Sequence, residues 1–222
     1  MKKILLAPSI LSANFCKLGK EVRQVLQFGA DIIHFDVMDN HYVPNITFGP
    51  LVLESLRNNN IVHPIEVHLM VHPVTKILIK NFIDVGATTI IVHPETTYDL
   101  NNIINFIKSF GCKVGLALSP NIEINYLYPF LDIIDIVLVM SVMPGFGGQK
   151  FLLEIFQKIS CIRKLLNEQK NTILLEVDGG VTLQNVKKIV TVGADIVVLG
   201  TSLFGTNDYQ KTLKNFKKIL FI

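Results

Sequence analysis

The sequence predicts an α/β fold, a closed (β/α)8 TIM barrel in which residues 1–222 form a single domain. Three observations lead to this prediction. Short apolar, β-branched segments alternate with longer segments of helical spacing, eight of each in 222 residues. The apolar segments are nearly continuous, as is typical of parallel strands buried on both faces. No GxGxxG fingerprint follows the first strand, which disfavours a doubly wound open sheet.

Each expected element follows from its local pattern. The strands are the β-branched apolar segments, expected at residues 4–7, 32–37, 65–70, 89–92, 114–118, 136–140, 173–177 and 196–199. The helices have apolar residues three and four apart, and are expected at residues 18–28, 50–57, 75–85, 100–110, 124–131, 151–166, 184–192 and 209–220. Three helices end in a matching glycine, Gly29, Gly86 or Gly193, which can turn the chain back into a strand. Eight such units fit the small end of the range of about 200 to 400 residues for these barrels.

The composition excludes several classes of protein. Hydrophobic residues make up 50% of the chain and charged residues 18%, which excludes a disordered chain. The longest uncharged stretches, residues 40–53 and 136–149, are shorter than the ~18 residues of a spanning helix, so we expect no membrane segment. The first six residues imitate a secretory signal. Pro8 breaks the apolar run that begins at Ile4, and no small-residue cleavage site follows, so we interpret these residues as the start of a buried strand.

Charge and cysteine content indicate a cytoplasmic protein without a nucleic-acid partner. The net charge is +3, and the densest group of lysines, on the last expected helix, has the spacing of a solvated face. The three cysteines, Cys16, Cys112 and Cys161, are odd in number and form no CxxC motif. That pattern is typical of reduced thiols in the cytosol.

Polar side chains interrupt three expected strands near their carboxyl ends, where a barrel carries its chemistry. His34 and Asp36 are two apart and point to the same side of the second strand, His68 lies in the third, and Asp178 follows the seventh. Each alone is compatible with a hydrogen-bonded core histidine or a helix cap. Together they predict a site for one divalent metal ion. Two nitrogen and two carboxylate ligands suit Zn²⁺, Fe²⁺, Mn²⁺ or Co²⁺ and do not distinguish among them.

Glycines follow three successive strands. They are Gly145, Gly147 and Gly148 after the sixth, Gly179 and Gly180 after the seventh, and Gly200 after the eighth. Backbone amides at glycines can approach an anion closely, and barrels often bind phosphate with the loops after strands seven and eight. A tight turn is the alternative for any one pair. The three loops together predict a phosphate site formed by backbone amides.

Five long motifs stand at the ends of the expected strands. They are APSILSANF at 7–15, HFDVMD at 34–39, VHLMV at 67–71, MSVMPGFGGQ at 140–149 and EVDGGV at 176–181. In this order and at these positions the chain resembles the ribulose-phosphate 3-epimerase family from its first strand to its eighth. Two residues and one segment depart from the family pattern: Met143 replaces Asn, Thr201 replaces Ser, and residues 119–122 read SPNI. None of them belongs to the four expected metal ligands.

The resemblance implies a metal-dependent epimerase, a homo-oligomer, that interconverts D-ribulose 5-phosphate and D-xylulose 5-phosphate in the pentose phosphate pathway. It implies that His34, Asp36, His68 and Asp178 bind the metal. Asp36 and Asp178 would be the catalytic pair that moves the proton at C3 through an enediolate. The implied substrate contacts are Ser9, His68, Gly145, Phe146, Gly147, Gly148, Asp178, Gly179, Gly180, Gly200 and Thr201. The implied pocket lining near the reacting carbon is Met38, Met70 and Met140.

Three other functions share parts of this pattern. A 3-epimerase of a hexulose 6-phosphate would have the same motifs and a different pocket wall. A decarboxylase of the same barrel type is disfavoured, because that class relies on a lysine beside its aspartates and residues 66–71 contain none. A barrel that binds phosphate or metal without turnover would not remove the C3 proton of the substrate, so deuterium exchange separates it from an epimerase.

Overall fold

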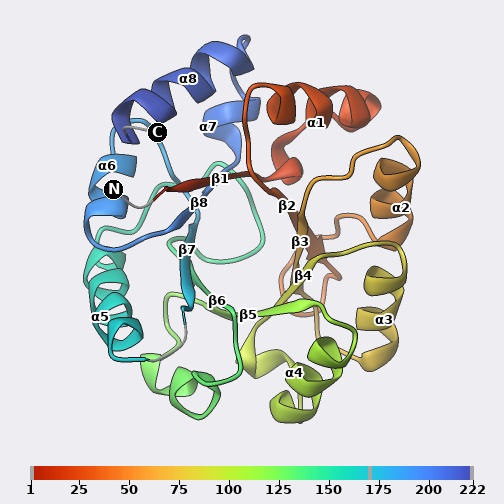
Figure 1. Cartoon of the computed structure of the whole chain (residues 1–222), viewed down its shortest axis with the longest axis vertical. Helices are drawn as coiled ribbons and strands as arrows, with labels where there is room; N and C mark the ends of the chain where they lie inside the picture. The colour runs from red at the N-terminus through yellow and green to blue at the C-terminus, as the bar shows by residue number, and fades with distance from the viewer. Residues whose placement is uncertain (1–2, 170–171, 221–222) are drawn as a thin grey trace.

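The computed structural model describes residues 3–169 and 172–220, which form a closed parallel barrel with helices around it (Figure 1). The strands in this part of the chain are β1 (Leu5–Pro8), β2 (Ile33–Met38), β3 (Ile65–Met70), β4 (Thr89–Val92), β5 (Lys113–Leu118), β6 (Ile136–Met140), β7 (Leu174–Asp178) and β8 (Ile196–Leu199). They pair in the order β1-β8-β7-β6-β5-β4-β3-β2, each parallel to the next. A parallel bridge between Ser9 and His34 brings β1 and β2 together. The predicted (β/α)8 TIM barrel is confirmed.

Helices cover the outside of the strands. They are α1 (Leu18–Gln27), α2 (Pro50–Asn58), α3 (Lys76–Asp84), α4 (Leu100–Ser109), α5 (Ile155–Asn167), α6 (Val186–Thr191), α7 (Thr201–Phe204) and α8 (Tyr209–Leu220). Short 3-10 helices are η1 (Ile10–Ser12), η2 (Phe15–Lys17), η3 (Pro94–Thr96) and η4 (Ile124–Phe130). Thr75 and Asp99 cap α3 and α4 by accepting from backbone amides of the first turn. The glycines predicted at helix ends have positive φ angles, 88° at Gly29, 97° at Gly86 and 132° at Gly193.

Two helical segments differ from the prediction. The helix expected at 124–131 is the 3-10 helix η4, with Pro129 inside it. Proline has no amide hydrogen for the α-helical ladder, which accounts for the tighter and shorter element. The helix expected at 151–166 begins only at Ile155, and residues 151–154 remain part of the loop after β6. The single-turn helix α7, directly after β8, was not expected.

Side chains alternate between the two faces of each strand. The outward residues pack against the helices in one large cluster that includes Phe35, Val67 and Val177. The inward apolar residues form separate clusters inside the barrel, one around Ile91 and Leu138 and another that includes Ala7, Ile136, Ile196 and Val198. In β2, β3 and β7 the residues of inward parity include polar ones: His34, Asp36, Glu66, His68, Glu176 and Asp178. The barrel interior therefore has one markedly charged region.

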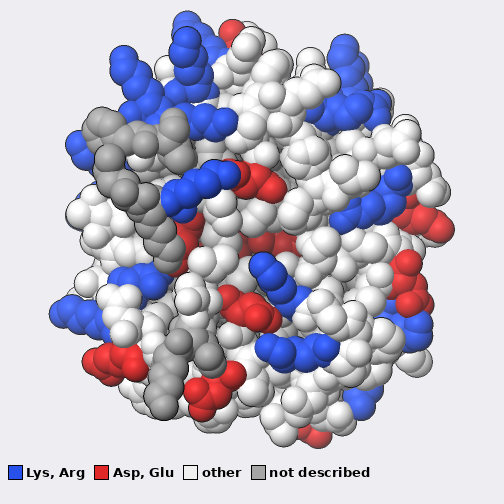
Figure 2. All heavy atoms as spheres, in the orientation of Figure 1, with Lys and Arg blue, Asp and Glu red and all other residues white. Residues whose placement is uncertain are grey.

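Charged side chains are interspersed over the surface that Figure 2 shows, with lysines gathered over α8. Lys211, Lys214 and Lys218 are exposed, while the half-buried Lys217 donates a hydrogen bond to the Phe28 carbonyl at 3.1 Å. Among the helices of the described residues, none has the length and apolar character to cross a membrane.

Candidate active site

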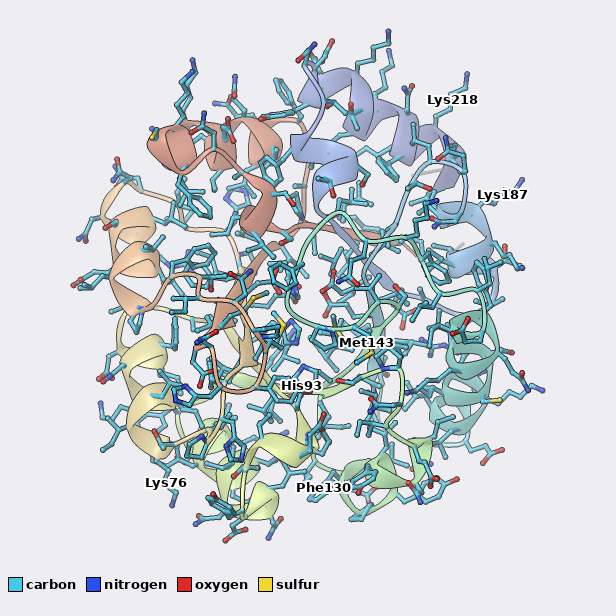
Figure 3. All side chains as sticks on the ribbon, turned by 180° about the vertical axis from the view of Figure 1, so that it is seen from behind. Lys76, His93, Phe130, Met143, Lys187 and Lys218 are labelled. Atoms are coloured by element: carbon cyan, nitrogen blue, oxygen red, sulfur yellow. The ribbon has the colours of Figure 1, made fainter. Side chains whose placement is uncertain are left out.

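A pocket opens at the carboxyl ends of the strands. Figure 3, which views the barrel from behind, places His93 and Met143 near the barrel axis. The lining consists of Ser9, Leu11, Ser12, Asp36, Met38, Met70, Met140, Val142, residues 143–149, residues 178–181, Val198, Gly200, Thr201 and Ser202. Each of the expected substrate contacts and pocket methionines except His68 is in this lining. His34 and His68 are fully buried, with no exposed surface.

The four expected metal ligands come together beside this pocket. Asp36 Oδ1 lies 3.2 Å from His34 Nε2 and 3.1 Å from His68 Nδ1, and Asp178 Oδ2 lies 3.9 Å from His34 Nε2. One ligand atom from each of the four residues lies within 4.8 Å of all the others. Register explains the convergence, because Asp36 is directly opposite His68 in the β2–β3 pair. Two ring nitrogens and two carboxylates at this spacing fit one divalent transition-metal ion.

The far side of His34 contacts two buried glutamates. Its Nδ1 lies 2.8 Å from Glu66 Oε1 and 3.5 Å from Glu176 Oε1. Both glutamates are buried, and Glu66 Oε2 and the two Glu176 oxygens have no hydrogen-bond partner. With a metal ion bound in place of the Nε2 proton, a hydrogen bond from Nδ1 to Glu66 would leave the Nε2 lone pair directed at the ion, which is the orientation that a metal ligand needs.

Burial and mutual charge set the protonation of the cluster. Burial lowers the pKa of His68 to about 4. Burial opposes a charge on His34 as well, but Asp36 and hydrogen bonds to nearby carboxyl groups raise its pKa well above the ordinary value. Against the effect of burial, the charge and hydrogen bond of His34 lower the pKa of Asp36. Burial and the Asp36 charge raise the pKa of Asp178 to about 7. A protonated His34 offsets the carboxylates, and a metal ion can take over that role because its ligands bind deprotonated.

Several residues of this region were missed from the sequence. Glu66 and Glu176 are carboxylates inside apolar strands, a signal as strong as the one that identified His68. His93 follows β4 and is fully buried, with its Nε2 2.9 Å from His68 Nε2. The signal for His93 was a histidine at a strand end, the position at which Asp178 was recognised.

The glycine loops form part of the pocket wall. Gly148, Gly179 and Gly180 have positive φ angles of 76°, 115° and 59°, which side chains rarely tolerate. A Cβ atom added at Gly147 or Gly200 would lie 3.4 or 3.1 Å from the Ser12 hydroxyl. Of the described residues that line the pocket, none is lysine or arginine. This wall therefore offers backbone groups and hydroxyls to a ligand.

Fold and site define the class of protein, a (β/α)8-barrel enzyme with a cluster able to hold a metal ion at the mouth of its barrel. The chain belongs to the ribulose-phosphate 3-epimerase family, because the family model matches residues 5–204. It is therefore an isomerase of the epimerase type. The resemblance read from the five motifs is confirmed.

Relatives of high similarity carry the same name. The chain is 50% identical over 220 residues to a ribulose-phosphate 3-epimerase of Buchnera aphidicola from Acyrthosiphon pisum, covering 99% of this chain and 96% of the relative. It is 50% identical over 211 residues to the enzyme of Serratia marcescens, covering 95% and 100% of the two chains. The enzyme of Escherichia coli K12 is 46% identical over 220 residues, covering 99% and 97%.

Solved structures of lower sequence similarity share the fold. The chain resembles 3-keto-L-gulonate-6-phosphate decarboxylase from Vibrio cholerae with a TM-score of 0.76 and 14% identity, covering 99% and 98% of the two chains. It resembles 3-hexulose-6-phosphate synthase from Salmonella typhimurium with a TM-score of 0.74 and 14% identity, covering 98% and 99%. These likenesses support the barrel architecture alone.

Proposed function

We propose that the chain interconverts D-ribulose 5-phosphate and D-xylulose 5-phosphate by two-base proton transfer at C3, with one divalent metal ion in the site. His34, Asp36, His68 and Asp178 would hold the ion, which is Zn²⁺, Fe²⁺, Mn²⁺ or Co²⁺. When bound, it supplies a Lewis acid beside the ketone oxygen of the substrate. The observation that carries the proposal is the convergence of two carboxylates from different strands on two imidazoles beside a glycine-walled pocket.

The two carboxylates can serve opposite faces of one carbon. Asp36 projects from β2 and Asp178 from the end of β7, and β1 and β8 separate these strands in the ring. In one direction Asp36 takes the C3 proton, the electron pair of that C–H bond forms a second C2–C3 bond, and the π pair of the C2 carbonyl moves onto its oxygen to give the enediolate. Asp178 then gives its proton to the other face of C3 as the C2 carbonyl re-forms. Reversal exchanges the two roles.

Other residues orient the groups that react. The Ser9 hydroxyl donates to Asp36 Oδ2 at 2.6 Å and so fixes the carboxylate, with Oδ1 towards the histidines. The glycine wall would bind the phosphate away from the reacting carbon, which orients the substrate without altering its chemistry. Met38, Met70 and Met140 line the same pocket and would exclude water from the enediolate.

Deuterium exchange tests this proposal. The metal-loaded chain is incubated in deuterated water with D-ribulose 5-phosphate and, separately, with a hexulose 6-phosphate. We expect D-xylulose 5-phosphate to appear with deuterium at C3, and the pentulose to react faster than the hexulose. Asp84→Asn is the control, since Asp84 is exposed and pairs with Lys80 on α3. If the chain binds the pentulose phosphate without exchange, it is a non-catalytic binding barrel. If the hexulose 6-phosphate reacts faster, the substrate is a hexulose phosphate and not a pentulose phosphate.

A further inference from the structure

Four side chains form a hydrogen-bonded chain from the metal cluster to an acid outside it. His68 Nε2 lies 2.9 Å from His93 Nε2, and His93 Nδ1 lies 3.0 Å from the Tyr42 hydroxyl. That hydroxyl lies 2.7 Å from Glu95 Oε1. His68 belongs to β3, His93 follows β4, Glu95 lies in η3, and Tyr42 belongs to the loop after β2. Elements far apart in the sequence therefore meet behind one ligand.

The outer end of this chain determines the direction of its hydrogen bonds. The Tyr42 hydroxyl donates to Glu95 Oε1, and such contacts lower the pKa of Glu95 despite its burial, so Glu95 is an acceptor. Burial and Glu95 raise the pKa of Tyr42, so the phenol keeps its proton and donates it to Glu95. With its proton given to Glu95, the Tyr42 oxygen faces His93 Nδ1 at 3.0 Å as an acceptor, so a proton on Nδ1 avoids two opposed lone pairs. The Ser119 hydroxyl lies 3.0 Å from the same oxygen and 3.2 Å from His93 Nδ1, and in this arrangement it donates to the Tyr42 oxygen.

The direction of the hydrogen bonds at the Glu95 end determines which ring nitrogen carries the proton in His93 and in His68. A neutral His93 that carries its proton on Nδ1 has a lone pair on Nε2, which accepts from His68 Nε2–H. His68 then has a bare Nδ1, and this atom lies 3.1 Å from Asp36 Oδ1 in the cluster. Two lone pairs facing each other at this distance repel unless a cation lies beside them. We propose that His93, Tyr42 and Glu95 are positioning residues that hold His68 in the tautomer whose Nδ1 binds the metal.

This inference rests on the proposed metal site, and it adds which residues fix the tautomer of one of its ligands. His34 has its carboxylate, Glu66, in direct contact, whereas His68 reaches Glu95 through an imidazole and a phenol. Both ligand histidines thus donate their outer N–H and present their other nitrogen to the cluster. Loss of such a partner typically weakens metal affinity by about 10- to 100-fold.

Cobalt affinity tests the proposal without using turnover. The visible absorption of Co²⁺ is followed in the full chain against a competing chelator. His93→Leu removes the acceptor of His68, and we expect its Co²⁺ affinity to fall by about 10- to 100-fold. His93→Gln keeps an acceptor oxygen and should restore most of the affinity. Tyr42→Phe should weaken binding, and Tyr98→Phe should not, because Tyr98 is 88% exposed and its ring contacts His72 instead.

Imidazole ¹⁵N NMR of the unmodified chain gives a second readout that does not depend on the folding of a variant. We expect the Zn²⁺-loaded chain to bind the ion through His68 Nδ1 and to carry protons on His68 Nε2 and His93 Nδ1. A proton on His68 Nδ1 or on His93 Nε2 in the loaded chain, or a folded His93→Leu that binds Co²⁺ within about twofold of the unmodified chain, would overturn the proposal. Failure of the unmodified chain to bind Co²⁺ would instead contradict the proposed metal site itself.

Discussion

At the scale of single residues, both oxygens of Asp36 have assigned partners. The Ser9 hydroxyl occupies Oδ2, and Oδ1 faces His34 and His68. Asp178 has no such side-chain partner within 3.5 Å among the described hydrogen bonds, and it is the more exposed of the two, at 16% of its side chain against 3%. The two carboxyl groups therefore differ in surroundings although the proposed reaction needs them in interchangeable roles.

Single substitutions of these aspartates should separate the two faces of C3. With Asp178→Asn or Asp36→Asn, net epimerisation should fall by about 10² to 10⁴-fold, because one face lacks its proton carrier. The remaining acid can still exchange the proton of the one epimer whose C3–H bond faces it. Deuterium should thus enter one pentulose phosphate with Asp178→Asn and the other with Asp36→Asn, as read by mass spectrometry.

Metal content must be measured in both aspartate variants, because both residues are proposed ligands. A variant that retains its metal and still interconverts the two sugars at nearly the unmodified rate would contradict the two-base assignment. Symmetric exchange into both sugars by one variant would do the same.

The three thiols should differ sharply in reactivity. Cys16 and Cys161 are exposed, whereas Cys112 is buried and its Sγ donates to the Ala87 carbonyl at 3.4 Å. Burial raises the pKa of the Cys112 thiol to about 11, so little thiolate forms there near neutral pH. At about pH 8 iodoacetamide should label Cys16 and Cys161 and spare Cys112, whose rate should rise as the pH approaches 11. Peptide mapping checks this, with the denatured chain as control, and rapid labelling of folded Cys112 at pH 8 would refute it.

Residue patterns predicted the proposed metal ligands better than the residues that hydrogen-bond to those ligands. His34, Asp36 and His68 stand out because an alternating strand shows which residues share a face. Glu66 and Glu176 have the same parity and gave the same signal, but their role behind His34 follows only from the contacts in the folded barrel. Tyr42 lies in a loop, and no spacing rule connects it with His93.

At the scale of elements, the loops after β6 and β7 pack closely against each other. A Cβ atom added at Gly180 would lie 2.4 Å from the Phe151 amide nitrogen, and Gly180 has a φ of 59°. The loop after β6 therefore needs glycine at this position for its own packing. Substitution of Gly180 would disturb the fold as well as any anion, so it is a poor probe of phosphate binding.

Gly147 is the better probe of the phosphate wall. An added Cβ there would only touch the Ser12 hydroxyl at 3.4 Å, and the methyl group would enter the pocket. Gly147→Ala should raise KM for the phosphorylated sugar by about tenfold, or ~1.4 kcal/mol. The free energy of unfolding should stay within about 0.5 kcal/mol of the unmodified value. Steady-state kinetics and urea unfolding measure the two effects.

Gly49→Ala is the matched control for Gly147→Ala. Nothing lies within 4 Å of the added Cβ, and Gly49 precedes α2 outside the proposed substrate pocket. It should leave KM unchanged. A fall in kcat with unchanged KM in Gly147→Ala would show that this loop serves the chemical step instead of the phosphate.

Strands were easier to predict than helices because burial on both faces leaves an unbroken apolar signal. Each predicted strand lies within one residue of the observed one. The segment at 124–131 has apolar residues at helical spacing, but it contains Pro129 and forms the 3-10 helix η4. Spacing alone does not distinguish these two outcomes.

At the scale of the whole molecule, closure of the barrel creates the site. The bridge between Ser9 and His34 joins the first strand to the second and brings the Ser9 hydroxyl to Asp36. In an open sheet with the same strands, β1 and β2 would have no such contact. The count of eight strand–helix units predicted this closure, and closure is what turned separate strand-end residues into one predicted site.

Because the proposed ligands come from β2, β3 and β7, only the folded barrel can bring them together, and metal binding should stabilise the fold. A ligand at 100 times its Kd that binds only the folded chain adds about 2.7 kcal/mol. At about 2–4 °C per kcal/mol for a chain of this size, Co²⁺ should raise Tm by about 5–11 °C. Thermal unfolding with Co²⁺ and with excess chelator measures the shift.

Two histidine variants make this thermal test specific to the cluster. His68→Ala removes one proposed ligand and should lose most of the cobalt-induced rise in Tm. His63→Ala should keep the full rise, because His63 is exposed and lies before β3, outside the cluster. The chelator-treated forms of both variants give each its own reference, so a lower intrinsic stability of His68→Ala does not enter the comparison. Equal cobalt-induced shifts in the two variants would show that the ion stabilises the barrel from somewhere other than these four side chains.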